Sequence, residues 1–266
     1  MRIERGAILV LVGLLVAFLG LPVAVLVIRA VAGGALPTAF GDPIVLQALL
    51  LSVGTTAVSL LLTVLLGTPL AYVLARRRFF GASVLETIVH LPIVLPPSVA
   101  GLALLLVFGR RGLIGSSLEV VGLAIPFTTV AVVMAQVFVA APFFVRSARA
   151  GFAAVDRDLE DAARVDGAGE RQVFRWATAP LAGAALAAGL VMSWARALGE
   201  FGATIMFAGN VTGRTQTLPL VVYGEFGAGH LDASIAAASI LVLAAFGVLV
   251  AVRLLGWGRA LDLRGA

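Results

Sequence analysis

The sequence predicts an all-α protein with six membrane-spanning helices. Of the 266 residues, 61% are hydrophobic and 12% are charged, and the mean hydropathy is +1.10, whereas soluble domains average roughly 45–50% apolar and about 25% charged residues. Six apolar segments reach the length of about 20 residues that a helix needs to cross a bilayer. They cover residues 7–28, 46–75, 88–108, 125–145, 181–207 and 233–252. Because these spans fill the chain, we expect residues 1–266 to form a single transmembrane domain.

The first span follows Arg2 and Arg5, an arrangement that is also found in signal peptides. Its apolar stretch is longer than the roughly 7–15 residues of a signal-peptide core, so we expect it to be retained as a helix. Six crossings put both termini on one side of the membrane. If that side is the cytoplasm, fourteen of the 19 arginines are cytoplasmic, four are external, and Arg196 lies within a span. The positive-inside rule therefore predicts cytoplasmic N- and C-termini.

The second span carries small and polar side chains at helical spacing. Thr55, Ser59, Thr63 and Gly67 recur every four residues, and such a face lets another helix approach closely. Close helix packing is the simpler interpretation of this face. Lining of a pore is the alternative.

The third span contains three prolines within six residues, Pro92, Pro96 and Pro97, followed by Ser98. Proline removes a backbone donor and clashes with the preceding turn, so a straight helix is not expected here. Broken backbone at membrane depth is tolerated only where protein or a water-filled cavity satisfies its polar groups. These four residues are therefore candidates for the wall of a translocation path, and a kinked packing helix is the equal alternative.

The fourth span leads into the longest polar stretch of the chain, a cytoplasmic loop at about residues 146–180. Asp158, with Asp161 three residues later, predicts the start of a short helix at about residues 159–165, and Gly167 can end it in a left-handed conformation. One face of that helix would carry Leu159, Ala162, Ala163 and Asp166. The two alanines leave room for a partner surface. A second helical stretch, residues 170–178, precedes Pro180.

Several kinds of chemistry are excluded by composition. The chain has no cysteine, so it forms no disulfide and offers no thiolate, and its two histidines make a metal site improbable. It has no lysine, so it lacks the lysine of a phosphate-binding loop. Any nucleotide energy must therefore come from another subunit. The arginines lie at membrane edges without aromatic clustering, so nucleic acid is not expected as a partner.

The cytoplasmic loop resembles that of ABC importer permeases. The pattern of that family is Glu-Ala-Ala, three residues, Gly, about nine residues, then a hydrophobic residue and Pro. Here Asp161-Ala162-Ala163 is followed by Gly167 and later by Pro180, with Asp161 in place of Glu and Ala179 in place of a larger aliphatic residue. The resemblance implies a type I permease fold in a prokaryotic plasma membrane. It also implies that the short helix docks on an ATP-binding cassette ATPase subunit and that two copies of the chain assemble.

Three further regions narrow the resemblance to oxyanion permeases. They are residues 91–97 with 108–112, residues 141–146, and residues 195–204 with 208–210 and 213–220. The Arg-Ala-Leu-Gly-Glu-Phe-Gly core that starts at Arg196 resembles molybdate and sulfate permeases, and the run that includes Thr215, Gln216 and Thr217 resembles the molybdate branch. The resemblance implies import of molybdate, with tungstate as a further substrate and sulfate or thiosulfate as the alternative. It implies delivery by an extracellular or periplasmic oxyanion-binding protein, and it makes the three residues candidates for the path or gate.

The fifth span contains two opposite charges, Arg196 and Glu200. A charged side chain at the bilayer centre costs roughly 2.5–3.5 kcal/mol on insertion scales, so both side chains must face protein or water. At a spacing of four residues they can pair on one helix face. An ion pair that fixes the helix beside a gate is the simpler interpretation. Direct contact of Arg196 with the passing anion is the alternative.

Two other classes of protein fit the sequence less well. A channel or stand-alone secondary anion transporter would need no docking loop, and coupling to protons or sodium would call for intramembrane carboxylates, of which Glu200 is the single deep example. An intramembrane enzyme is disfavoured because His90 lies at a membrane edge and His230 lies in an external loop. The expected role is therefore that of a non-catalytic transport subunit without a cofactor.

Overall fold

The computed structural model describes residues 2–254, and all regular structure in that range is helical. The elements in chain order are α1 (Arg2–Ala32), α2 (Ala35–Gly41), α3 (Pro43–Arg76), α4 (Ala82–Val94), α5 (Pro97–Phe108), α6 (Gly115–Val120), α7 (Thr129–Ala154), α8 (Arg157–Val165), α9 (Glu170–Val173), the π-helix η1 (Phe174–Thr178), α10 (Ala179–Leu181), α11 (Gly183–Leu198), α12 (Gly202–Phe207), α13 (Leu218–Gly227) and α14 (Leu231–Leu254). Arg259 and Arg264, which we expect on the cytoplasmic side, lie outside the described residues.

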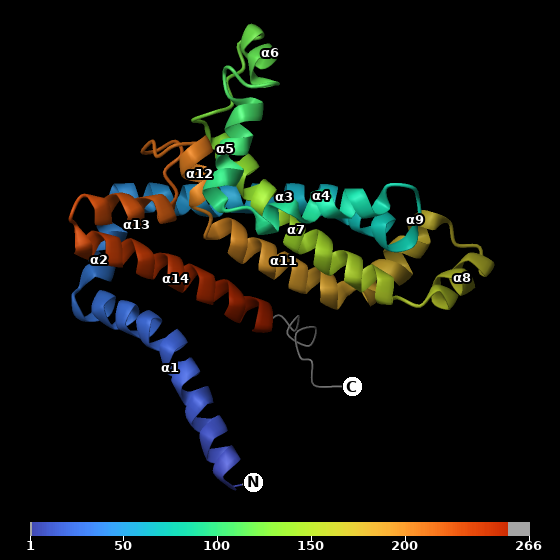
Figure 1. The fold of residues 1–266 in the computed structure, drawn as a ribbon, viewed down its shortest axis with the longest axis horizontal. Helices are drawn as coiled ribbons and strands as arrows, with labels where there is room; N and C mark the ends of the chain where they lie inside the picture. Colours follow the sequence, from blue (N-terminus) through green and yellow to red (C-terminus); the bar gives the residue numbers. More distant parts are fainter. Residues whose placement is uncertain (1, 255–266) are drawn as a thin grey trace.

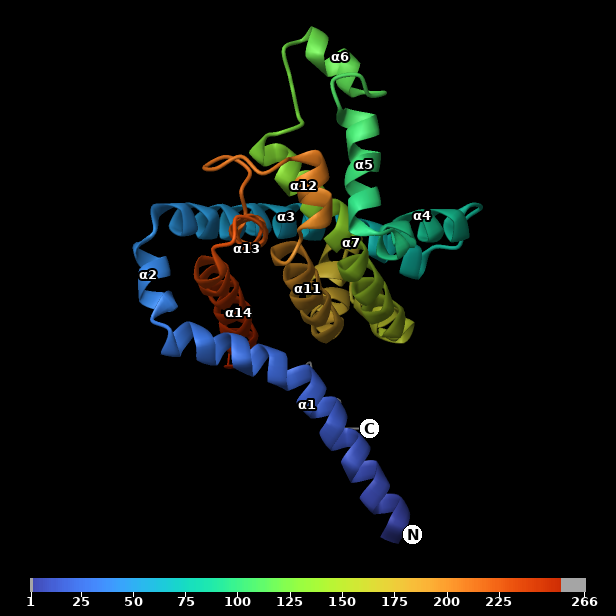
Figure 2. The same ribbon diagram turned by 60° about the vertical axis from the view of Figure 1, so that its left-hand side comes forward.

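Four of these helices are each long and apolar enough to cross a membrane: α1, α3, α7 and α14. Two further pairs reach that length together but are bent, α4 with α5 by 119° and residues 170–181 with α11 by 72°. The described residues therefore hold four candidate spans, or six if each bent pair is one span. Figure 1 shows α6 and the adjoining end of α5 projecting away from the other helices, and in Figure 2 the N-terminal half of α1 extends away from the rest.

The centre of the fold is α7, which packs along both α3 and α11. The small and polar face of α3 is buried against it: a Cβ on Gly67 would lie 3.0 Å from the Phe144 ring, and Ser59 donates a hydrogen bond to Gln136 at 2.8 Å. Within this chain the face serves helix packing, which supports the simpler of the two interpretations.

The boundaries of the fourth span differ from the prediction. Helix α7 begins at Thr129, where the side chain of Thr128 accepts a hydrogen bond from the Ala131 amide, and it continues to Ala154. Residues 146–154, expected in the cytoplasmic loop, belong to this helix because their small and apolar side chains, such as Ala148 and Phe152, pack inward. The helix therefore ends nine residues later than the predicted span.

The fifth span was also predicted wrongly as one helix over residues 181–207. Helix α11 ends at Leu198, and α12 begins only at Gly202. The break is stabilised by Glu200, whose buried Oε1 accepts a hydrogen bond from the Ala203 amide at 2.7 Å. Glu200 was expected to lie on a helix face. Its side chain instead accepts a hydrogen bond from the first turn of α12, where the backbone offers no acceptor.

Candidate functional site

The short helix predicted for residues 159–165 is present as α8, with one correction at its start. Its N-cap is Asp156, whose Oδ1 accepts a hydrogen bond from the Asp158 amide at 3.1 Å, so the predicted cap at Asp158 is wrong. The helix includes residues 159–165 as predicted. An acidic N-cap satisfies a free amide donor, and its charge is favourable at the positive end of the helix.

The predicted end of α8 is confirmed. Gly167 has φ +89°, a conformation in which a side chain is strained. The Gly167 amide bonds to the Arg164 carbonyl and the Ala168 amide to the Ala163 carbonyl, both at 3.0 Å. These two bonds form a Schellman motif, which turns the chain back on itself after the helix.

The predicted docking face of α8 is open to solvent. The Leu159 side chain is 51% exposed, Ala162 and Asp166 are exposed, and Ala163 is half-buried. Beside this face, Ala163 and Gly167 line a cavity of about 370 Å³ that continues to Trp176. The face thus presents one large apolar side chain, Leu159, and small side chains to solvent.

The segment after α8 is helical as predicted for residues 170–178, but it changes type along its length. A turn of α-helix (α9) passes into the π-helix η1, and α10 follows with Pro180 in its first turn. Arg164 connects α8 to this segment, with Nη1 2.6 Å from Asp161 and Nε 2.8 Å from Glu170. The hydrogen bond from Arg164, together with its charge, holds the pKa of the Glu170 carboxyl below its usual value.

Sequence reasoning missed a buried cluster behind α8. Glu160 is 3% exposed, and its Oε1 accepts hydrogen bonds from Arg76 Nη2 and Thr178 Oγ1, each at 2.7 Å. Arg76 ends α3, 84 positions before Glu160 in the chain. In the sequence it is one of three consecutive arginines at a membrane edge, so no local pattern distinguishes it.

The proline-rich third span forms an elbow between α4 and α5. Pro92 lies inside α4, Pro96 is the N-cap of α5, and Pro97 occupies its first turn, with Ser98 exposed next to it. The predicted break is confirmed. The structure places α12 against this elbow, because a Cβ on Gly202 would lie 2.7 Å from the Pro97 Cβ.

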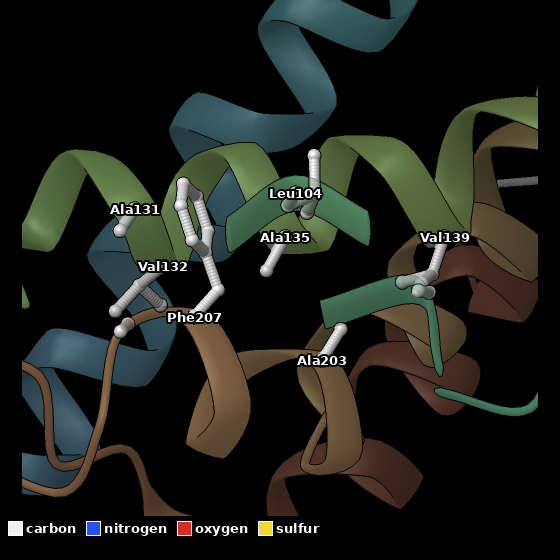
Figure 3. Close-up of a cluster of buried hydrophobic side chains, with 9 residues drawn as sticks. Leu104, Ala131, Val132, Ala135, Val139, Ala203 and Phe207 are labelled. Atoms are coloured by element: carbon white, nitrogen blue, oxygen red, sulfur yellow. The ribbon is translucent and has the colours of Figure 1, made fainter. Parts of the chain in front are cut away.

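Helices α5 and α12 also touch further along. A Cβ on Gly101 would lie 2.6 Å from the Ala203 carbonyl oxygen, so the two backbones meet without room for a side chain. Figure 3 shows Leu104 of α5 together with Ala203 and Phe207 of α12, packed over α7. The elbow and the break after α11 are therefore one packed unit.

Arg196 and Glu200 form the predicted ion pair between Nη1 and Oε2. The Glu200 side chain is fully buried, whereas that of Arg196 is 28% exposed. The pair thus holds a buried carboxylate at the break between α11 and α12, next to the packed elbow. This arrangement fits the structural interpretation of the pair.

The three polar residues after α12 play different parts. Thr215 is buried, accepting a hydrogen bond from the Val211 amide at 2.9 Å and donating one to the Gly209 carbonyl at 3.3 Å. Thr217 is the N-cap residue of α13, and its buried hydroxyl has no hydrogen-bond partner among the described residues. Gln216 between them is partly exposed. Thr215 therefore holds the shape of the loop.

The candidate residues fall into two groups, at different places in the fold. Figure 1 shows α8 and α9 at one end of the molecule, away from α5 and α12. The long helices α3 and α7 run between these two groups. An arrangement of this kind suits transmission of motion from one end to the other.

Comparison with known proteins decides the family. The model of the family described as "Binding-protein-dependent transport system inner membrane component" matches residues 67–259. The chain belongs to this family. It is thus an ABC importer permease, and the matched region contains α8, the elbow, the ion pair and the 215–217 loop.

Curated relatives of this permease carry the name molybdenum transport system permease protein ModB. The protein from Mycobacterium tuberculosis is 46% identical over 205 residues, which cover 77% of each chain. The protein from Escherichia coli K12 is 41% identical over 193 residues, covering 70% of this chain and 84% of the relative. The chain thus covers most of the length of these relatives.

Solved structures resemble the permease in fold. A chain of a bacterial ABC transporter involved in the import of the acidic polysaccharide alginate superposes with a TM-score of 0.76 at 16% identity, covering 99% of this chain and 96% of the other. A chain of the MetNI methionine ABC transporter in an inward-facing conformation gives a TM-score of 0.57 at 19% identity. At such identities the likeness shows the fold.

Proposed function

We propose that this chain is the membrane-spanning permease subunit of an ATP-driven importer that carries molybdate, with tungstate as a further substrate, into the cytoplasm. The observation that carries the proposal is the identity of 46% over three quarters of the chain to permeases named for molybdenum transport. The sequence run 213–220, which resembles the molybdate branch, supports the same substrate.

The proposed site of coupling is α8 with the turn that follows it. A separate ATPase subunit docks on the open face formed by Leu159, Ala162 and Ala163, and the left-handed Gly167 sets the direction of the chain that leaves it. The exposure of that face and the small side chains on it support this role. Asp161 adds an exposed negative charge at its edge, where Arg164 holds it.

The proposed path runs past the elbow and the break after α11. Pro92, Pro96, Pro97 and Ser98 form one wall, the Arg196–Glu200 pair fixes the adjacent backbone, and Thr215, Gln216 and Thr217 shape the loop beyond it. One chain forms a single domain with six spans and both termini in the cytoplasm. Two copies enclose the path, and an extracellular binding protein delivers the anion.

The test of this function is uptake by the reconstituted complex. Proteoliposomes that contain the permease, its ATPase subunit and internal ATP should import radiolabelled molybdate when the binding protein is added outside. Unlabelled tungstate should compete at concentrations similar to those of molybdate, and sulfate should compete far more weakly. Preferred import of sulfate would mean that sulfate, and not molybdate, is the substrate. Import without the ATPase subunit would contradict the proposal that the chain belongs to an ATP-driven importer.

The permease alone should not hydrolyse ATP. It has no lysine for a phosphate-binding loop, and the proposed role assigns hydrolysis to the partner. The purified chain should release phosphate from ATP at the background rate, and the complex should be inhibited by vanadate. Vanadate-sensitive turnover by the isolated chain would contradict the assignment.

A further inference from the structure

Behind α8, a chain of three hydrogen bonds joins η1, α8, α3 and the residue that follows α7. Thr178 Oγ1 of η1 donates to Glu160 Oε1 of α8 at 2.7 Å, and Arg76 Nη2 of α3 donates to the same oxygen at 2.7 Å. The same Nη2 also donates to the Val155 carbonyl at 3.1 Å, just after α7. Glu160 Oε1 and Arg76 Nη2 thus hold three places in the chain against α8: the end of α3, the residue after α7 and the end of η1.

These groups are shielded from water. The side chains of Arg76 and Glu160 are 9% and 4% exposed, and Thr178 is fully buried. In such surroundings charges attract strongly, but removing one partner leaves the other charge buried and unpaired. The bonds also have fixed directions, so α8 keeps a single position relative to the three neighbouring elements as long as they persist.

An aromatic cluster lies beside the polar one and joins the same helices. The rings of Tyr72, Phe152 and Phe174 come from α3, α7 and η1, and their centres lie 5.3–5.8 Å apart in edge-on and tilted arrangements. Tyr72 is one helical turn before Arg76, and Phe174 precedes Thr178 by four residues. The aromatic rings clamp α3, α7 and η1 to one another without a contribution from α8. Glu160 attaches α8 to this clamp from the buried side, whereas the exposed Arg164–Glu170 pair joins α8 to α9.

The π-helix adds a second reason to regard this region as functional. Short π-helical turns occur often at functional sites, and Thr178 is the last residue of η1, directly before α10 and α11. The donor that reaches Glu160 thus lies about one helical turn before the 72° bend between residues 170–181 and α11.

We propose that Arg76, Glu160 and Thr178 form the joint that passes the movement of α8 to α3 and α11. Glu160 acts as a positioning residue: it contacts neither the anion nor ATP, and it makes the docking helix move as one body with the two membrane helices. The inference rests on the proposed docking of an ATPase subunit on α8. It differs from the docking face itself, since Glu160 lies on the buried side of that helix.

The test measures how many anions are imported for each ATP hydrolysed. Reconstituted complexes with Glu160→Gln, Arg76→Gln or Thr178→Val should retain the ATPase subunit and hydrolyse ATP, because the exposed face of α8 is unchanged. Their ratio of molybdate imported to ATP hydrolysed should fall by at least about fivefold, the lower end of typical couplings between sites. Arg76→Lys should keep most of the ratio, because an ammonium group has enough donors for both acceptors.

Two matched controls separate the joint from general effects of charge and shape. Arg77→Gln removes the adjacent, exposed arginine, and Thr87→Val removes an exposed hydroxyl that bonds only to Ser83 within its own helix. Both should leave the ratio at the wild-type value. An unchanged ratio in the joint variants, with uptake and hydrolysis reduced in proportion to the amount of assembled complex, would overturn the proposal and leave a purely structural cluster.

A second measurement does not depend on transport. Because the chain has no cysteine, spin labels can be placed at Leu159→Cys on α8 and Arg78→Cys after α3, both exposed positions. The joint predicts one narrow distance distribution that broadens in Glu160→Gln and Thr178→Val, and equal widths would contradict it. If the wild-type complex neither binds the ATPase nor couples to it, the proposed function fails, whereas normal wild-type coupling with unaffected variants rejects the joint alone.

Discussion

At the scale of single residues, the Arg196–Glu200 pair is unequal in its burial. The Glu200 carboxylate is fully buried and also accepts a hydrogen bond from the Ala203 amide, whereas the Arg196 side chain is 28% exposed. A partly exposed arginine can recover solvation when its partner is lost, but a buried carboxylate cannot. The two partners therefore differ in what their removal costs.

This difference predicts an ordered double-mutant cycle. Arg196→Gln leaves the buried Glu200 carboxylate unpaired, so it should lower the free energy of unfolding by up to about 3–5 kcal/mol. Glu200→Gln should lower it less, because the remaining arginine is partly exposed. The double variant should be more stable than additivity predicts, with a coupling of about 0.5–3 kcal/mol. Denaturant unfolding in detergent measures the stability, and uptake assays report function. Strict additivity of the two substitutions would argue against pairing. If Arg196→Gln reduced uptake equally whatever residue stood at position 200, direct contact of Arg196 with the anion would be favoured.

Gly167 is a second residue at which the backbone makes a specific demand. Its φ is +89°, and a Cβ there would meet no atom within 4 Å, so the cost of a side chain is that of the backbone alone. Gly167→Ala should cost about 1 kcal/mol in the local turn and redirect the chain after α8. The ATPase subunit should then co-purify less, as measured in pull-downs from membranes with normal amounts of the permease. Gly183→Ala, at an open position without positive φ, should bind the ATPase normally.

These residues differ in how far the sequence predicts them. Gly167 could be predicted because helix termination is local, and the pairing of Arg196 with Glu200 because four residues separate them. The bond from Arg76 to Glu160 depends on the packing of α3 against the segment after α7, so no sequence spacing indicates it. Thr215 looked like a gate residue by resemblance, and only the structure reveals its bonds to the backbone of its own loop.

At the scale of elements, the elbow between α4 and α5 is packed against α12. Three prolines predict that the helix breaks, but they do not predict the 119° angle or the presence of α12 against α5. That contact depends on Gly101 and Gly202, which lie 101 positions apart in the chain. The sequence therefore predicts the break, whereas tertiary packing determines which helix lies against it.

The α5–α12 contact predicts that a single methyl group added at Gly101 lowers the stability of the protein. Gly101→Ala places a Cβ 2.6 Å from the Ala203 carbonyl oxygen, so the two helices must separate. Overpacking of this kind costs about 1–3 kcal/mol, which should appear as a lower unfolding midpoint and reduced uptake. Gly54→Ala in α3, where a Cβ meets no atom within 4 Å, is the control and should be as stable as the wild type. Equal stability of the two variants would mean that α5 and α12 are not in close contact.

The connection between α8 and α9 predicts a dependence on pH. Arg164 lowers the pKa of Glu170, so this bond contributes fully above the ordinary carboxylate range and is lost as the pH falls through the lowered value. A spin label at Ala168→Cys should become more mobile in that acid range. In Arg164→Gln the ion pair is absent at every pH, so the label should be mobile at neutral pH and show no such transition. The same transition in both proteins would assign it to another group.

At the scale of the whole molecule, hydropathy predicts where the chain can cross the bilayer but not how the spans assemble. The expected apolar segments correspond to helices, although the fourth and fifth have different limits because residues 146–154 pack inward and Glu200 ends α11. The central packing of α7 between α3 and α11 joins elements from three separate spans. Helix α1 buries none of its apolar window within the chain, so lipid or a second copy must cover it.

Orientation in the membrane is the last prediction, and the absence of cysteine makes it directly measurable. Ser117→Cys lies in α6, between the third and fourth spans, and Arg171→Cys lies in α9, after α8; both positions are exposed. The positive-inside rule places the first outside and the second in the cytoplasm. A membrane-impermeant maleimide should therefore label Ser117→Cys in intact cells and Arg171→Cys only in inverted vesicles, with the unaltered chain unlabelled in both. Labelling of Arg171→Cys in intact cells would put α8 on the wrong side for an ATPase and would contradict coupling through this helix, whatever the anion.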